Sequence, residues 1–242
     1  MKKKIVTIVL SVALMSALVF LFTGCGSIVN VNGNYKAITS SEAHDLLKNS
    51  DFEQTGGFEL KTEMSIKIGD DYSDMKSEAV INYGEQDFKF SSTTKITSKE
   101  GGIKASTTMS IYADNEYVYT NLAGVKTKAK LTDDFVGSVG IGSFESLIEG
   151  VNENSEFSLA ESGNVKKLKI ELDYTESGLT APAEFYIVLE NNKLSGIAVK
   201  CSYSDTIDSK AVSMKVDMQF GVSTKQAVLP SDLSEYKLPN EI

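Results

Sequence analysis

The sequence predicts a mainly β fold, a single large curved antiparallel sheet in the form of an open half-barrel. Three observations support this prediction. Apolar and polar residues alternate with a period of two over most of residues 58–131 and again over residues 167–220, as in strands with one buried and one solvated face. Gly, Asn and Asp separate these runs as turn residues. The connections are too short for the crossover helices that a parallel sheet requires.

A short helix is expected before the sheet. Thr39-Ser40-Ser41-Glu42 is a capping box, in which the Thr39 side chain accepts from the backbone N–H of Glu42 and the Glu42 carboxylate reaches back. Three apolar residues follow at helical spacing, Ala43, Leu46 and Leu47. We therefore expect a helix over about residues 40–49. His44, the single histidine, falls on its polar side, where a solvent-facing structural role is expected.

The strand segments follow from the alternation. A meander covers residues 58–68, 75–83, 88–96, 103–111, 117–122 and 125–131. Further strands cover residues 167–174, 185–190, 197–203 and 212–220, and a last strand ends at Pro230. Between Thr132 and Asn154 the pattern breaks, and dense apolar residues with Ser143 as a cap favour a helical insert ending near Gly150. A sheet with one apolar face must cover it, either by closing into a barrel or by helices in its concavity, and the two expected helices suit the second solution.

The N-terminus has the pattern of an export signal. Lys2, Lys3 and Lys4 precede a run without charge from Ile5 to Phe22. This run is nearly long enough to cross a bilayer, so an uncleaved membrane anchor is the alternative. Thr23-Gly24-Cys25 resembles a bacterial lipobox, and the resemblance implies a signal peptide over residues 1–24, cleavage after Gly24 and acylation of Cys25. The expected location is the extracytoplasmic face of the cell membrane, with the lipid as the anchor.

Residues 25–38 are expected to form a lipidated tether, and residues 39–242 the folded domain. The tether contains Gly and Asn without periodicity, and it would extend to about 40 Å. Removing residues 1–24 removes three Lys and no acid, which changes the formal charge from −9 to −12. Because membrane surfaces are usually acidic too, we expect the domain to stay near the lipid without being drawn flat onto it.

Composition excludes several functions. The chain has no Arg and a formal charge of −9, so it lacks the guanidinium that reads phosphate and guanine, and a nucleic-acid partner is excluded. It offers no Cys and His set for zinc, and Gly137 to Gly142 lacks the ending of a phosphate-binding loop. Asp70, Asp71 and Asp74 lack the spacing of a calcium loop. We predict no catalytic residue, no metal and no cofactor, and interpret Cys201 as a buried hydrophobe.

The chain resembles the LolA-like group of lipoprotein carriers and their relatives, the mycobacterial lipid-binding lipoproteins. The resemblance rests on the lipobox at Cys25, on Ile111 to Tyr119 followed by Lys126-Thr127-Lys128, and on Val228-Leu229-Pro230. It implies an unclosed barrel whose concave face, plugged by helices, accepts acyl chains. The soluble carrier of the group uses a buried Arg at its lid, and this chain has none. Only the general property of an apolar cavity is therefore carried over.

The candidate ligand cavity lies between the sheet and the insert. Small hydroxyls among bulky residues on the inner face leave room for a ligand. The candidate lining residues are Phe88, Phe90, Thr94, Thr107, Met109, Ile111, Phe135, Phe144, Leu147 and Ile148. The expected function is binding of a lipid or other apolar ligand. Two alternatives remain: an ordinary packed core, and a non-catalytic protein-interaction or envelope-structure module whose partner the sequence does not identify. The lysines at 126, 128 and 130 form either the wet face of an edge strand or a contact for anionic headgroups.

Overall fold

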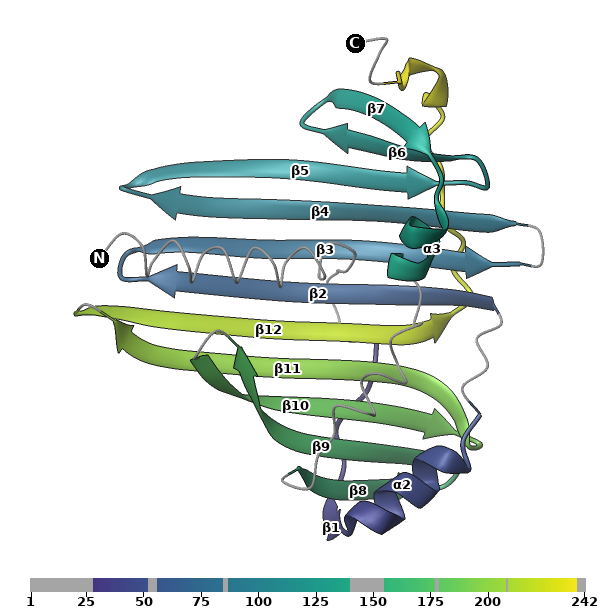
Figure 1. Ribbon diagram of the computed structural model, residues 1–242, viewed down its shortest axis with the longest axis vertical. Coiled ribbons are helices and arrows are strands. Elements are labelled where there is room, and N and C mark those ends of the chain that lie inside the picture. Colours follow the sequence, from purple (N-terminus) through teal and green to yellow (C-terminus); the bar gives the residue numbers. More distant parts are fainter. Residues whose placement is uncertain are drawn as a thin grey trace.

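The computed structural model describes residues 28–51, 56–84, 87–139, 155–176, 179–207 and 209–238. Twelve strands form one sheet (Figure 1). They are β1 (Lys36–Ile38), β2 (Gly56–Ile68), β3 (Asp71–Tyr83), β4 (Phe88–Glu100), β5 (Ile103–Ala113), β6 (Tyr117–Leu122), β7 (Val125–Lys130), β8 (Glu156–Ser162), β9 (Val165–Glu176), β10 (Leu179–Glu190), β11 (Lys193–Ile207) and β12 (Lys210–Ser223).

The sheet is antiparallel and open, which confirms the predicted fold class. Its order is β1-β8-β9-β10-β11-β12-β2-β3-β4-β5-β6-β7, so β1 and β7 are its two edges. β12 pairs with β2 over almost their full lengths, and this pair joins the halves built before and after the insert. The edge of β7 is partly covered by the C-terminal segment, since the Lys128 N–H donates to the Lys237 carbonyl at 2.8 Å.

Two helices pack on the same face of the sheet, which we call the apolar face. The expected N-terminal helix is present as α2 (Ser40–Lys48), with both hydrogen bonds of the capping box formed between Thr39 and Glu42. The predicted insert begins with α3 (Asp133–Val139), where the Phe135 N–H donates to the Thr132 hydroxyl at 3.3 Å. The helix expected from Ser143 to about Gly150 lies outside the described residues.

The apolar face carries two clusters of buried side chains. One lies on β2 to β5 under α3 and centres on Phe90. The other lies on β8 to β11 under α2, which inserts Ala43 and Leu47. Phe220 of β12 packs against both clusters, so they form one continuous layer. Alternate residues of the same strands point to the opposite, polar face, as the period of two requires.

The N-terminal segment differs from the tether expected over residues 25–38. Residues 28–35 lie on the polar face, where Val29 is 4% exposed and packs with Tyr186, Val188 and Ala198. The Gln219 side-chain oxygen accepts from the backbone N–H of Ile28 at 2.9 Å and of Val29 at 3.3 Å. Residues 36–38 then form β1 against β8. Residues 28–38 of the expected tether therefore belong to the folded domain.

The prediction of a C-terminal strand that ends at Pro230 is wrong. The last strand among the described residues is β12, which ends at Ser223. Both neighbours of β12 are already occupied, by β11 and β2, so no sheet position beside it is free. The chain instead crosses the polar face: the Asn82 amide bonds the backbone of residues 225 and 227, and Tyr236 packs edge-on against Tyr119. No helix among the described residues is long and apolar enough to span a membrane.

Candidate functional site

Most of the predicted cavity residues lie together on the apolar face. Phe88 and Phe90 on β4, Ile111 on β5 and Phe135 on α3 belong to one cluster. Phe90 is fully inaccessible, and its ring meets that of Phe135 edge-on with centroids 5.7 Å apart. This part of the predicted site is closely packed. The remaining aromatic and aliphatic candidates, Phe144, Leu147 and Ile148, lie outside the described residues.

A row of three hydroxyl side chains crosses the apolar face beside this cluster. Thr62 on β2, Ser77 on β3 and Thr94 on β4 are direct cross-strand neighbours, and each is at most 1% exposed. The Thr94 hydroxyl donates to that of Ser77. The Thr62 hydroxyl is buried and has no hydrogen-bond partner among the described residues. These side chains are small, so they leave room that Leu or Phe at the same positions would fill.

All five methionines of the described chain lie on the apolar face, next to this row. Met64, Met75, Met109, Met214 and Met218 come from β2, β3, β5 and β12, and we call them the methionine patch. Met64 and Met75 are paired across strands; of the five, only Met75 is fully buried. Methionine side chains are flexible and polarisable, which suits a surface that adapts to apolar ligands of varied shape.

Sequence reasoning named only Met109 from this patch. The signal was present, because each of the five falls at an inward position of a predicted strand. Met109 lies opposite Thr94 and is half-buried, whereas the candidate Thr107 lies opposite Ile96 and is exposed. Cys201 is placed beside the patch, opposite Val216, and its burial raises the pKa of the thiol. The sequence predicts Cys201 to be a buried hydrophobe; it is on the apolar face as expected but only half-buried.

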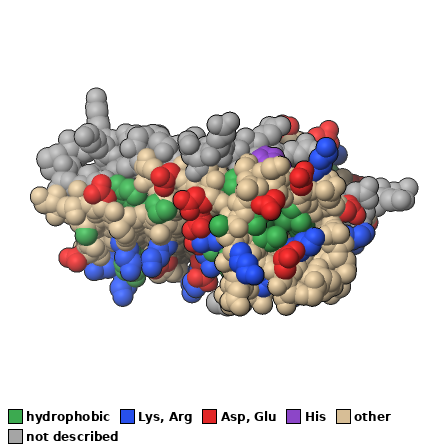
Figure 2. All heavy atoms as spheres, turned by 90° about the horizontal axis from the view of Figure 1, so that it is seen from below, with side chains coloured by type: hydrophobic (Ala, Val, Ile, Leu, Met, Phe, Trp, Pro, Cys, Tyr) green, Lys and Arg blue, Asp and Glu red, His purple; other side chains and the backbone are tan. Residues whose placement is uncertain are grey.

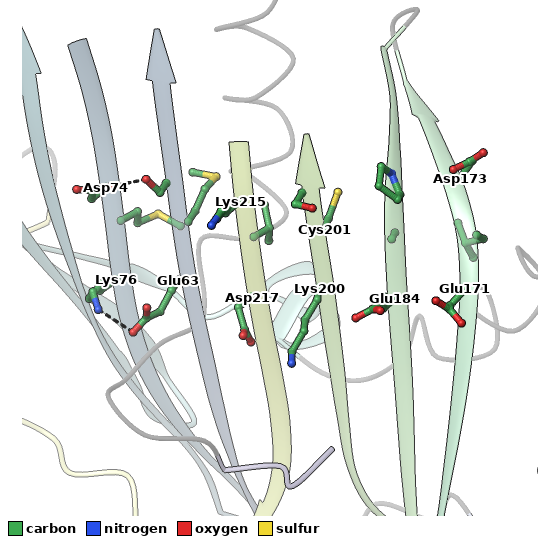
Figure 3. Close-up of a pocket in the computed structure, with 18 of the residues that line it drawn as sticks. Glu63, Asp74, Lys76, Glu171, Asp173, Glu184, Lys200, Cys201, Lys215 and Asp217 are labelled. Carbon is green, nitrogen blue, oxygen red and sulfur yellow. Dashed lines mark hydrogen bonds and ion pairs between the residues drawn. The ribbon is translucent and has the colours of Figure 1, made fainter. Parts of the chain in front are cut away.

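A separate hollow of about 990 Å³ crosses the polar face. Two neighbouring rows of polar-face side chains line it, and in Figure 3 one row runs from Lys76 and Glu63 through Asp217 and Lys200 to Glu184 and Glu171. Seven acids and three lysines line the hollow. No group of three or more residues that could hold a metal ion occurs among the described residues. Sequence reasoning did not anticipate this acidic hollow.

Three of the acids that line the hollow are in ion pairs. Lys169 lies 2.8 Å from both Glu171 and Glu184, and Lys76 lies 2.8 Å from Glu63. Burial disfavours ionised Glu184, but hydrogen bonds from Lys169 and Tyr186 outweigh it and hold the pKa of Glu184 below its ordinary value. Glu184 is thus held in its charged form. His44 is exposed on α2, where its Nδ1 contacts the Ser40 carbonyl oxygen at 2.8 Å.

Comparison with known proteins gives few relatives. No protein-family model and no curated protein matches the chain. Among solved structures it is similar to LprF from Mycobacterium bovis, with a TM-score of 0.41 and 11% identity over 79% of this chain and 97% of that one. It is also similar to the S-type phycobiliprotein lyase CPES from Guillardia theta, with a TM-score of 0.15 and 8% identity over 76% and 94% of the two chains. Likenesses at this level establish neither a family nor a function.

Proposed function

We propose that the protein is a membrane-anchored extracytoplasmic lipoprotein that binds a lipid or another apolar ligand against the apolar face of its sheet, without catalysis. The methionine patch is the observation that carries this proposal. The anchor would be the acylated Cys25 that remains after cleavage at Gly24, as the lipobox pattern indicates. The same pattern implies the extracytoplasmic face of the cell membrane as the location.

The patch has the chemistry of an acyl-chain site. From Phe58 to Ile66 on β2, and at the cross-strand partners of these residues on β12 and β3, the apolar face holds no charged side chain. An ionised headgroup would find no counter-ion there and would stay in solvent, while a hydrocarbon chain would lose water on contact with the patch. The α2 and α3 clusters bound this region on either side.

A matched pair of variants tests the binding site. Met214 and Ser213 are adjacent on β12, both half-buried, and their side chains point to opposite faces. Met214→Glu places a carboxylate in the patch, and Ser213→Glu places the same group on the polar face. Titrated with a dansyl-labelled fatty acid in detergent-free buffer, Met214→Glu should bind at least tenfold more weakly than the wild type, because the carboxylate must be desolvated. Ser213→Glu should retain wild-type affinity.

Native mass spectrometry of the chain purified from membranes provides an independent test. We expect a species with one bound lipid in the wild type and a reduced fraction in Met214→Glu. A wild-type chain that stays ligand-free after exposure to phospholipid vesicles, and that binds the fatty acid no better than Met214→Glu, would refute the proposal. That result would favour the protein-interaction module. The anchor is tested separately, because Cys25→Ser should abolish incorporation of labelled palmitate and release the chain from the membrane.

A further inference from the structure

The polar face of β4 to β7 is rich in lysine. Its polar-face positions carry seven lysines and no acid; the other side chains there are Ser, Thr, Tyr and Asn. The lysines are Lys89, Lys95 and Lys99 on β4, Lys104 on β5, and Lys126, Lys128 and Lys130 on β7. Figure 2 shows lysine side chains projecting from one side of the molecule. A chain with a formal charge of −9 thus keeps a basic region on one half of its polar face.

Four of these lysines make neither an ion pair nor a side-chain hydrogen bond with another described residue, whereas Lys99 donates to the Asp70 carbonyl oxygen at 3.2 Å. Lys126 is neutralised by Asp232 and Glu235, each 2.5 Å away, and Lys89 is paired with Asp87. The four without such a partner are Lys95, Lys104, Lys128 and Lys130, which we call the lysine surface. Lys128 and Lys130 both lie 5.2 Å from the centre of the Tyr117 ring, which keeps their side chains on the polar side of the edge strand.

Acidic side chains gather instead on the other half of the polar face, where seven of them line the hollow over β2, β3 and β8 to β12. Asp74 and Glu78 on β3 are the acids beside the β4 end of the lysine surface, and Asp74 is engaged by the Ser65 hydroxyl at 2.6 Å. The net charge therefore conceals a separation of charge within one face. Electrostatic attraction to a surface depends on the charges that meet it, within about one Debye length, rather than on the net charge.

The chain enters the fold on this same face. The backbone N–H groups of Ile28 and Val29 are bonded to Gln219 on β12, so the described chain begins on the polar side. The apolar run ends at Phe22, and Cys25 lies three residues before Ile28. Six residue steps span at most about 20 Å, and three about 10 Å. On the proposed anchoring, either an acylated Cys25 or an uncleaved apolar run therefore keeps the bilayer within this reach of Ile28.

We propose that the lysine surface lies against anionic lipid headgroups, so that the domain rests on the membrane with its polar face down. Each lysine close to an anionic surface contributes about fivefold to the binding equilibrium. Four lysines on one face of the sheet act together once the N-terminus holds the domain at the bilayer. This inference reverses the expectation, drawn from the net charge, that an acidic domain is not drawn flat onto the membrane.

Lysine accessibility measured in the full chain tests this proposal. The wild-type chain is reconstituted into vesicles of phosphatidylcholine alone and of phosphatidylcholine with about 30% phosphatidylglycerol, and flotation verifies its anchoring in both. Brief acetylation followed by mass spectrometry gives the rate at each lysine. We expect the lysine surface to react at least threefold more slowly on the anionic vesicles, and 0.5 M salt to remove the difference. Lys36 and Lys48, which lie on β1 and α2 and are exposed, serve as internal controls and should react equally on both.

The outcomes are separable from those of the anchoring proposal. Flotation with both vesicles but equal acetylation rates would overturn the inference and leave the anchor intact. Protection of Lys36 and Lys48 instead of the lysine surface would also overturn it, as would protection that is independent of the anionic lipid, which would point to a protein contact. A variant with Lys95, Lys104, Lys128 and Lys130 changed to Gln should lose the salt-sensitive protection of neighbouring Lys99, while the wild-type measurement stands regardless of the stability of this variant.

Discussion

Gln219 fastens the N-terminal segment to the sheet, and its loss should free that segment. The side-chain oxygen of Gln219 accepts from Ile28 N at 2.9 Å and from Val29 N at 3.3 Å, and its amide nitrogen donates to Asp217 at 3.1 Å. Gln219→Met keeps the length and most of the volume of the side chain but removes the acceptor. Two partly buried backbone N–H groups then lose this hydrogen bond, which costs about 2 kcal/mol in total. This corresponds to about a 30-fold larger population in which the segment is detached.

Hydrogen exchange measures that population directly. In the variant, the amides of residues 28 and 29 should exchange about 30 times faster than in the wild type. Amides in the middle of β10, such as that of Ile187, should be unchanged, because their ladder bonds to β9 and β11 do not depend on the segment. Gln226→Met, the same substitution at an exposed position, is the matched control.

A specific result would refute the reasoning. If the amides of residues 28 and 29 exchange in the wild type as fast as in an unstructured peptide, the contact is not populated in solution. If they are protected but Gln219→Met leaves them unaffected, then the burial of Val29 alone holds the segment. Val29 distinguishes these cases, since its side chain packs with Tyr186, Val188 and Ala198 while only its backbone N–H bonds to Gln219. Val29→Ala should therefore loosen the segment through lost packing, even where Gln219→Met does not.

Two further predictions concern stability. Phe90→Ala should lower the free energy of unfolding by about 3–5 kcal/mol in urea titrations, because Phe90 is fully buried and packs against Phe135; a loss below about 1 kcal/mol would contradict the packing described for this cluster. Burial disfavours ionised Glu59, but hydrogen bonds from Lys225 and Ser223 hold its pKa below the ordinary value. The contribution of Glu59 to the free energy of unfolding is therefore fully present above the unfolded pKa of about 4.5. It is lost as the pH falls through the folded pKa. The wild type should thus lose more stability on acidification from about pH 6 to pH 3 than Glu59→Gln, and equal losses would contradict this assignment.

The parts of the fold that were predictable from the sequence depend on local information. The capping box of Thr39 and Glu42 fixes the start of α2, and the observed end at Lys48 is one residue from the expected end. The alternation of apolar and polar residues correctly predicts the boundaries of β6 and the position of Phe88 and Phe90 on the apolar face of β4. These patterns are properties of residues close together in the sequence, so they can be recognised without knowing which strands pair.

The two segments that cross the polar face could not be predicted in this way. Residues 28–35 show no hydrophobic period, and their position depends on two residues that are distant in sequence. Gln219 accepts a hydrogen bond from the Val29 N–H, and Gly196 leaves space for the Val29 side chain. Residues 227–229 have high β propensity, yet the sheet offers no position next to β12, and Val228 is 71% exposed. In both cases the tertiary partner decides the outcome, and propensity does not. The candidate site was partly predictable for the same reason: Met109 was found, whereas the patch as a whole required the pairing of β12 with β2.

Because alternate residues of a strand point to opposite faces, the proposed ligand site and the proposed membrane contact lie on opposite sides of the sheet. On β5, Met109 points to the apolar face and Lys104 to the polar face, and the same separation holds across β4 to β7. A domain that rests on headgroups through its lysines must therefore turn the methionine patch away from the bilayer. A ligand drawn from the anchoring membrane would then have to pass around an edge of the sheet, at β1 or β7, because the sheet itself has no opening between paired strands. Salt, which weakens the lysine contact, should accordingly speed the uptake of a labelled lipid from anionic vesicles and leave uptake from neutral vesicles unchanged.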